Sequence, residues 1–99
     1  MIKSLENNIE NGLDMIKDSL LSCPKTPGVY IFSNKNEVLY IGKAKNLFKR
    51  VKSYLGFTSQ TRRIKKMISY ATNLKFINTH TESDALLLEA NLIKKHKPI

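Results

Sequence analysis

Two short runs of β-branched and aromatic residues, at positions 29–32 and 38–41, lie on either side of a polar segment that contains two asparagines. This pattern predicts a β-hairpin, so at least part of the fold is a sheet. If residues 34–36 form a three-residue loop, Tyr30 lies directly opposite Tyr40 and both side chains share one face. A slip of one residue would separate the two tyrosines, so their pairing is a specific prediction.

Helical patterns surround the predicted hairpin. Apolar residues recur at helical spacing along residues 4–22, and Thr81 begins a capping-box sequence before another such pattern. The predicted helices are 4–22, 46–55, 59–71 and 82–95, and a third strand is predicted at 74–78. We therefore expect an α+β fold in which helices flank a small three-stranded antiparallel sheet. Residues 1–23 are expected to pack as an amphipathic helix on a domain formed by residues 24–99.

The basic residues are distributed unevenly. The net charge is +9, and residues 38–81 contain ten Lys or Arg side chains and no carboxylate. Such a one-sided field favours a polyanion, either nucleic acid or an anionic membrane surface, and we favour nucleic acid. The alternative is a solvated basic surface that has no polyanionic partner.

The composition also restricts the compartment. No uncharged run approaches the ~18 residues needed to span a membrane. Three acidic residues, Glu6, Glu10 and Asp14, interrupt any apolar segment of a signal peptide. The single cysteine, Cys23, excludes an intrachain disulfide and fits a reducing environment. We therefore expect a cytoplasmic protein that does not associate with a membrane.

One carboxylate of the last predicted helix lies among apolar residues. Its neighbours three and four positions away are Ala85, Leu86, Leu92 and Ile93. Glu89 is therefore expected at the centre of an apolar face, where an ionised carboxylate needs a partner. A bound metal ion and a buried salt bridge to Arg50 or a lysine explain this position equally well. Exposure of this end of the helix is a third explanation.

A cation held by one carboxylate, together with phenols and an arginine on a basic surface, suits phosphodiester hydrolysis. The cation would act as a Lewis acid on the phosphate oxygens and would ready a water to protonate the leaving oxygen. Arg50 would bind the phosphate through two hydrogen bonds and stabilise the developing charge. One of the two tyrosines would orient or deprotonate the attacking water, with a cation such as Lys43 favouring its phenolate form.

The sequence resembles the GIY-YIG nuclease superfamily. GVY at residues 28–30 and YIG at residues 40–42 resemble its two signature tripeptides. The longer stretches PGVYIF, VLYIGKAKNLFKRVKSYL and ESDALLLEANLIKKHKP are closer still to the UvrC branch, and together they cover nearly all of the chain after the first helix. The resemblance implies a three-stranded antiparallel sheet with surrounding helices, and a nuclease activity located in residues 24–99.

The resemblance also implies roles for individual residues. Glu89 matches the metal-binding glutamate, which holds one divalent cation, Mg²⁺ or Mn²⁺. The positions that match catalytic residues are Tyr30, Tyr40, Lys43, Arg50 and Tyr54, and the motif glycines are Gly28 and Gly42. Further basic residues are expected to contact DNA phosphates, namely Lys45, Lys49, Lys52, Arg62 and Arg63.

In the UvrC branch the implied activity is the cut on the 3′ side of a lesion in double-stranded DNA, after UvrA and UvrB have located and verified it. The family pattern continues beyond Ile99 to an active-site asparagine, so we expect a fragment, monomeric by itself, of a longer protein that also contacts UvrB. One alternative is a stand-alone GIY-YIG nuclease that recognises DNA structure. Another is a non-catalytic module that binds DNA or UvrB, but the intact set Tyr30, Tyr40, Arg50 and Glu89 favours a nuclease.

Overall fold

The computed structural model describes residues 2–35, 37–56 and 59–97. In chain order its elements are α1 (Ile2–Leu20), β1 (Gly28–Asn34), β2 (Glu37–Ala44), α2 (Leu47–Lys52), the short 3₁₀ helix η1 (Ser53–Leu55), α3 (Arg62–Tyr70), β3 (Asn73–Asn78) and α4 (Glu82–His96). The strands form one antiparallel sheet in the order β2-β1-β3. The predicted α+β fold with a three-stranded antiparallel sheet is therefore confirmed.

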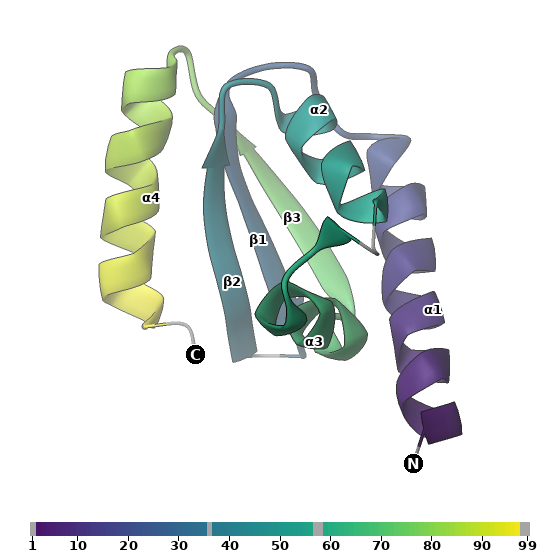
Figure 1. Cartoon of the computed structure of the whole chain (residues 1–99). Coiled ribbons are helices and arrows are strands. Elements are labelled where there is room, and N and C mark those ends of the chain that lie inside the picture. The colour runs from purple at the N-terminus through teal and green to yellow at the C-terminus, as the bar shows by residue number, and fades with distance from the viewer. Residues whose placement is uncertain (1, 36, 57–58, 98–99) are drawn as a thin grey trace.

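Helices cover both faces of the sheet (Figure 1). α4 lies on one face, and α1, α2 and α3 lie on the other side. The larger core, beneath these three helices, contains Tyr30 and Phe32, whereas Val29, Ile31 and Ala85 belong to a smaller core beneath α4. Successive residues of β1 thus point into different cores, which is why this central strand is apolar along most of its length.

The hairpin register differs from the prediction. Tyr30 pairs with Gly42, and Tyr40 pairs with Phe32, so the two tyrosines are diagonal neighbours on one face and not directly opposite each other. Asn34 pairs with Glu37, which leaves two residues between the strands in place of the predicted three. That shorter connection alone would move Tyr40 to the other face.

A β-bulge restores the shared face. The pairing shifts between Phe32 and Ser33, where Tyr40 and Val38 are the successive partners and Leu39 is the additional residue. Lys35, in the connection, has a left-handed backbone with φ 54°. The extra residue changes the alternation by one position, so Tyr40 returns to the face of Tyr30. The predicted common face is correct, and the predicted direct pairing is wrong.

Polar side chains fix where three helices begin. Asn46, Thr61 and Thr81 each accept a hydrogen bond from the backbone N–H three residues later, at 3.0–3.2 Å. These N-caps satisfy donors that the first helical turn leaves free. The start predicted at Thr81 is confirmed, whereas the helix predicted from residue 59 begins only at Arg62, after its Thr61 cap.

Close packing holds α1 on α3. A Cβ atom at Gly12 of α1 would overlap with the backbone oxygen of Ile68 in α3, so only glycine permits this approach. Ile16, one turn further along α1, is fully buried in the larger core. The division of the chain into a helix at residues 1–23 and a domain at residues 24–99 stays a prediction.

Candidate active site

Three polar side chains from three elements meet on the α2 side of the sheet. Tyr30 comes from β1, Arg50 from α2 and Tyr54 from η1. The Oη atoms of Tyr30 and Tyr54 lie 2.7 Å apart, and Arg50 Nε donates a hydrogen bond to Tyr30 Oη at 3.2 Å. Only 1% of the Tyr30 surface and 3% of the Tyr54 surface are exposed, so these hydrogen bonds replace contacts with water. We call these three residues the phenol–guanidinium cluster.

Burial sets the protonation of this cluster. Loss of solvent raises the pKa of Tyr30, and the hydrogen bonds with Tyr54 and Arg50 offset only part of that rise. Burial also raises the pKa of Tyr54, and the nearby Tyr30 adds to the effect. The hydrogen bond with Tyr30 raises the pKa of Arg50. At neutral pH the cluster therefore holds two neutral phenols and one positive charge.

Tyr40 lies beside the cluster, with its ring centroid 6.2 Å from that of Tyr30. It is half-buried. Within the described part of the chain its hydroxyl group has no hydrogen-bond partner, in contrast to the hydroxyl groups of Tyr30 and Tyr54. Tyr40 is therefore the phenol of this group that is free to contact a ligand.

The two motif glycines, Gly28 and Gly42, lie where neighbouring atoms leave no room for a side chain. Gly42 lies against the ring of Tyr30, and a Cβ atom there would overlap with both the ring and its hydroxyl group. A Cβ atom at Gly28 would overlap with the backbone oxygen of Ile77 on β3 and crowd the side chain of Leu47. Gly42 thus lets Tyr30 lie flat across β2, which directs its hydroxyl group towards Arg50.

A hollow with a volume of about 630 Å³ opens beside Arg50. We call it the Arg50 hollow, and its basic lining residues are Lys43, Lys45, Lys49 and Arg50. Among the described residues these cations have one carboxylate partner, because Lys43 Nζ lies 3.9 Å from Glu82 Oε1 of α4. The remaining positive charge suits the hollow to a phosphate group. Glu82 was not predicted, because no local sequence pattern links it to a lysine that is so distant in the chain.

The residues predicted to contact phosphates do not all lie together. Lys45 and Lys49 line the Arg50 hollow, but Lys52 is not among its lining residues, although it belongs to the same helix. Its Nζ atom lies 5.9 Å from the centre of the Phe48 ring. A cation over an aromatic face is stabilised there, so Lys52 is held outside the hollow.

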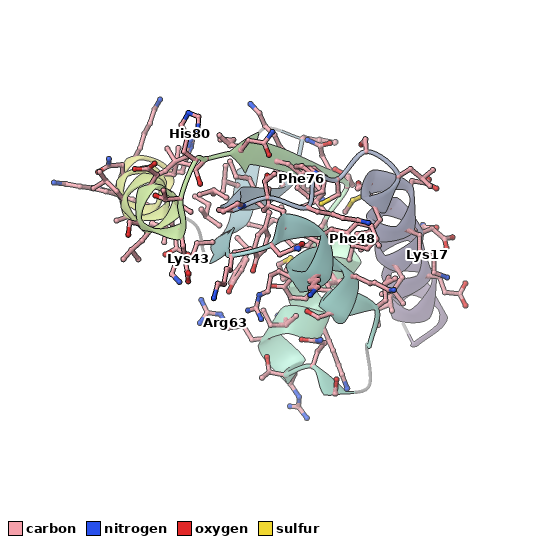
Figure 2. All side chains as sticks on the ribbon, turned by 90° about the horizontal axis from the view of Figure 1, so that it is seen from above. Lys17, Lys43, Phe48, Arg63, Phe76 and His80 are labelled. Carbon is pink, nitrogen blue, oxygen red and sulfur yellow. The ribbon has the colours of Figure 1, made fainter. Side chains whose placement is uncertain are left out.

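The two arginines at the start of α3 also differ. Arg63 lines a second groove, beside α3, whereas Arg62 lines neither of these two cavities. Seen from above, Lys43 and Arg63 lie towards the same side of the molecule, between α4 and the pair α2 and α3, and Lys17 of α1 lies on the opposite side (Figure 2). On this side the edge strand β2 lies between α4 and the helices of the opposite face (Figure 1).

Glu89 lies at the margin of the apolar face of α4. The side chains of this helix that pack on the sheet are Ala85, Leu88 and Leu92. Leu86 and Ile93, on the other side of Glu89, are 52% and 40% exposed. The apolar neighbours are those predicted, but the buried part of the face does not centre on Glu89, because only one side of the apolar stripe meets the sheet.

The Glu89 carboxylate has no polar partner in the described part of the chain. It is half-buried, and within residues 2–35, 37–56 and 59–97 it forms neither a hydrogen bond nor an ion pair. The predicted alternative of a salt bridge to Arg50 or a lysine is therefore absent from this part of the chain. The same residues contain no group of three His, Cys, Asp or Glu side chains that could hold a metal. One free carboxylate fits Mg²⁺, which keeps several waters and completes its shell with substrate phosphates.

The sequence profile of the UvrC-like GIY-YIG domain matches residues 26–99, which is most of the chain. The chain belongs to this family. Relatives of this UvrC-like GIY-YIG domain include the UvrABC system protein C of Thermus thermophilus, 55% identical over 76 residues, and that of Gluconobacter oxydans, 46% identical over 90 residues. The two matches cover 77% and 90% of this chain but only 12% and 14% of those proteins. The chain thus spans about one seventh of the length of the relatives it matches.

A solved structure of the same family has this fold. The N-terminal GIY-YIG endonuclease domain of UvrC from Thermotoga maritima, bound to magnesium as its catalytic divalent cation, is 44% identical to this chain. The match has a TM-score of 0.76 and covers 84% of this chain and 91% of the Thermotoga domain. The family and the fold predicted from the sequence are therefore confirmed.

Variants of the Thermotoga domain mark a set of tyrosines. Three of its structures each carry a tyrosine replaced by phenylalanine, and these three tyrosines are separated by ten and fourteen residues. Tyr30, Tyr40 and Tyr54 of the present GIY-YIG domain have the same separations. In another Thermotoga structure an asparagine is replaced by alanine. The roles of the individual residues in this chain stay predictions. Among its described helices, none is long and apolar enough to cross a membrane.

Proposed function

We propose that this chain is the metal-dependent endonuclease domain of a UvrC protein, which hydrolyses a DNA phosphodiester on the 3′ side of a lesion. The observation that carries the proposal is the phenol–guanidinium cluster, which holds a charged arginine at the edge of a cationic hollow. The hollow provides charge for a phosphate, and the neighbouring Tyr40 provides a free phenol. A pure binding surface would need no buried network behind its arginine.

Arg50 has two tasks in this proposal. Its Nε atom is fixed by Tyr30, so the terminal nitrogens of the guanidinium are left for two phosphate oxygens. A donor that is already oriented stabilises the charge of the transition state without reorganising during the reaction. Lys45 and Lys49 would hold adjacent phosphates, since they line the same hollow.

Tyr40 orients and deprotonates the attacking water. Its hydroxyl group has no hydrogen-bond partner among the described residues, so it can accept one from the water. Tyr30 is unsuited to this task, because its oxygen is buried and already shared by Tyr54 and Arg50. We therefore assign Tyr30 and Tyr54 to holding Arg50, and Lys43, which lines the Arg50 hollow, to the charge that attracts the phosphate.

Glu89 would hold the divalent cation. When bound, the cation supplies a Lewis acid for the phosphate oxygens and a water that protonates the leaving oxygen. A carboxylate that no described residue engages in a hydrogen bond or ion pair keeps its oxygens available for such a ligand. Its place at the margin of the apolar face leaves one side of the carboxylate open to solvent and substrate.

The partners follow from the same proposal. Because the relatives are UvrABC system proteins, we propose that UvrA and UvrB act in the same pathway on damaged double-stranded DNA, in the cytoplasm. The contact with UvrB would use parts of a longer protein outside these 99 residues. We propose that the chain by itself is monomeric and binds DNA weakly.

The test is a map of the cut. A duplex with one lesion and a label on the damaged strand is incubated with UvrA, UvrB and the longer protein that contains this chain, with Mg²⁺, with Mn²⁺ or with EDTA. We expect a metal-dependent nick on the 3′ side of the lesion. A nick that needs no lesion, UvrA or UvrB would instead indicate a stand-alone nuclease. Binding without any nick in either metal would indicate a non-catalytic module.

A further inference from the structure

We propose that a groove between the β-hairpin and α3 binds an unpaired nucleotide of a DNA strand, next to the nucleotide whose phosphodiester is cut. This inference rests on the proposed DNA substrate. The groove has a volume of about 1050 Å³ and is lined by the hairpin end of β1 and β2, by α3 and by the end of α4. We call it the hairpin–α3 groove. Its volume is at the upper end of the roughly 300–1,000 Å³ typical of ligand pockets, ample for one nucleotide.

The charge of the groove favours a polyanion. Four of its lining residues are basic and come from the hairpin connection, from α3 and from the C-cap of α4: Lys35, Arg63, Lys66 and Lys97. One lining residue, Glu37, is acidic. None of these five side chains forms an ion pair within the described residues, so the positive charge is available to a ligand. Phosphate groups are the polyanion that the proposed substrate provides.

The floor of the groove favours a base and not only a phosphate. It is formed by Leu39, Ile64 and Met67, which are half-buried or buried apolar side chains. Tyr70, at the end of α3, also lines the groove and is 51% exposed, so one large part of its ring is free for stacking. Stacking on an aromatic face is how proteins bind bases of single strands without regard to sequence. A duplex keeps its bases stacked inside and would bring only phosphates to this surface.

The walls of the groove are joined by hydrogen bonds. Asn34 Nδ2 donates to the backbone oxygen of Tyr70 at 2.6 Å, and the backbone N–H of Thr72 donates to the oxygen of Ser33 at 2.9 Å. These bonds tie the hairpin end of β1 to the end of α3. A groove held in this way loses little conformational freedom on binding, which favours affinity.

Tyr40 connects the groove to the candidate active site. It lines the groove, and its ring lies 6.2 Å from that of Tyr30 in the phenol–guanidinium cluster. A DNA strand that occupies the groove would therefore continue past the phenol that we assign to the attacking water. Placing an unpaired nucleotide here would select substrates whose helix is already distorted near the cut.

The test measures binding without cleavage. A fluorescent single strand of about 12 nucleotides and a duplex of the same sequence are titrated with the chain in EDTA, followed by anisotropy. Replacement Tyr70→Ala should weaken single-strand binding roughly 5-fold or more, and Tyr70→Phe should not, because the stacking ring remains. Arg63→Ala should lower the slope of log K against log salt by about 0.7, the share of one phosphate in a single strand. Lys17→Ala removes the same charge on the opposite side of the molecule and serves as the control.

Two further measurements complete the test. A photoreactive thymidine in the single strand should cross-link to the peptide that contains Tyr70, and circular dichroism should show that the Tyr70 variants fold. The proposal is overturned if the chain binds single strands with equal affinity in all variants, if it does not bind them, or if Tyr70→Ala weakens duplex binding equally. Because no cleavage is measured, each of these results leaves the proposed nuclease activity to its own test.

Discussion

The two faces of the sheet carry the proposed catalytic groups in different ways. On the α2 side, Tyr30, Tyr54 and Arg50 form a buried hydrogen-bonded cluster whose members satisfy one another. On the α4 side, Glu89 is half-buried and has no partner among the described residues. The polar groups of the first side satisfy one another, whereas the second side presents a carboxylate that could bind a cation. This contrast suggests that the protein positions its own cation, Arg50, in advance, and that the carboxylate is kept for an ion that arrives with solvent or DNA.

The contrast predicts that loss of Glu89 affects the reaction and not the fold. Glu89→Gln should reduce DNA cleavage by about 10³-fold, because a bound cation contributes several kcal/mol to the stabilisation of the transition state. The melting temperature should change by less than about 2 °C, since glutamine has a similar size and no hydrogen bond or ion pair with a described residue is lost. Gel-based nicking rates and thermal melting would measure both effects.

Asp84→Asn is the matched control for this prediction, since it removes an exposed carboxylate of the same helix. It should leave the cleavage rate unchanged. A normal rate in Glu89→Gln would contradict the assignment of the cation to this carboxylate.

Loss of Arg50 should affect both the reaction and the fold. Arg50→Ala should lower the cleavage rate about 100-fold, as for a missing donor to transition-state charge. It should also reduce the free energy of unfolding by about 1–2 kcal/mol, because the buried Tyr30 hydroxyl group loses a donor. Arg50→Lys should restore little of the cleavage rate or of the stability. A lysine cannot donate a hydrogen bond to Tyr30 and also offer two nitrogens in a fixed plane to a phosphate. Loss of activity without any loss of stability would mean that the cluster does not hold Arg50.

Adding a methyl group beside the buried Tyr30 ring should lower the free energy of unfolding, whereas the same addition at an open position should not. Gly42→Ala would push the Tyr30 ring out of place and should cost about 1–3 kcal/mol of the free energy of unfolding. Gly56→Ala is the control, because a Cβ atom there would meet its neighbours at 3.4 Å or more and φ is −74°. Urea denaturation would compare the two variants. Equal stability of both would contradict the packing of Tyr30 on Gly42.

The buried phenols should also make the protein sensitive to alkali. Because the pKa values of Tyr30 and Tyr54 are raised in the folded state, folding holds their protons after the unfolded chain has lost them. Their contribution to stability is therefore complete below about pH 10 and is lost as pH rises above that value. Tyr54→Phe should flatten this decline in urea denaturation measured between pH 8 and pH 11. A decline of unchanged steepness in the variant would assign the alkaline sensitivity to other groups.

The smallest expected effect separates two lysines of one helix. Lys49→Ala should lower the slope of log K against log salt for duplex binding by about 0.9, because it lines the Arg50 hollow. Lys52→Ala should leave that slope unchanged, since its ammonium group lies over Phe48. Anisotropy titrations at several salt concentrations would distinguish them. An equal change in both variants would show that the positive charge of α2 acts as a whole.

The parts of the fold that depend on neighbouring residues were predicted well. Thr81 caps the start of α4, the runs around Tyr30 and Tyr40 form β1 and β2, and a third strand follows α3, as expected. The family signature is equally visible, because GVY, YIG and the basic stretch that follows them all lie within residues 28–52. These features are encoded in local order, where spacing and residue type are directly visible.

The position of Glu89 illustrates what local patterns miss. Helical spacing correctly placed it next to apolar residues, but it could not tell which of them would be covered. Only one row, Ala85, Leu88 and Leu92, meets the sheet. The apolar face of α4 is wider than the part of it that the narrow sheet covers. Whether Glu89 is buried therefore depends on how far the sheet extends beneath the helix.

The sequence by itself determined the elements, the net charge of +9 and the residues that can take part in phosphate chemistry. Only the tertiary structure decided how those residues meet. The loop is shorter than expected, and a bulge in β2 then returns Tyr40 to the face of Tyr30 and places Gly42 beneath that ring. A strand register depends on the packing of both faces at once, and each one-residue change reverses every side chain. The hydrogen bond from Arg50 to Tyr30 follows from that packing, which no local pattern records.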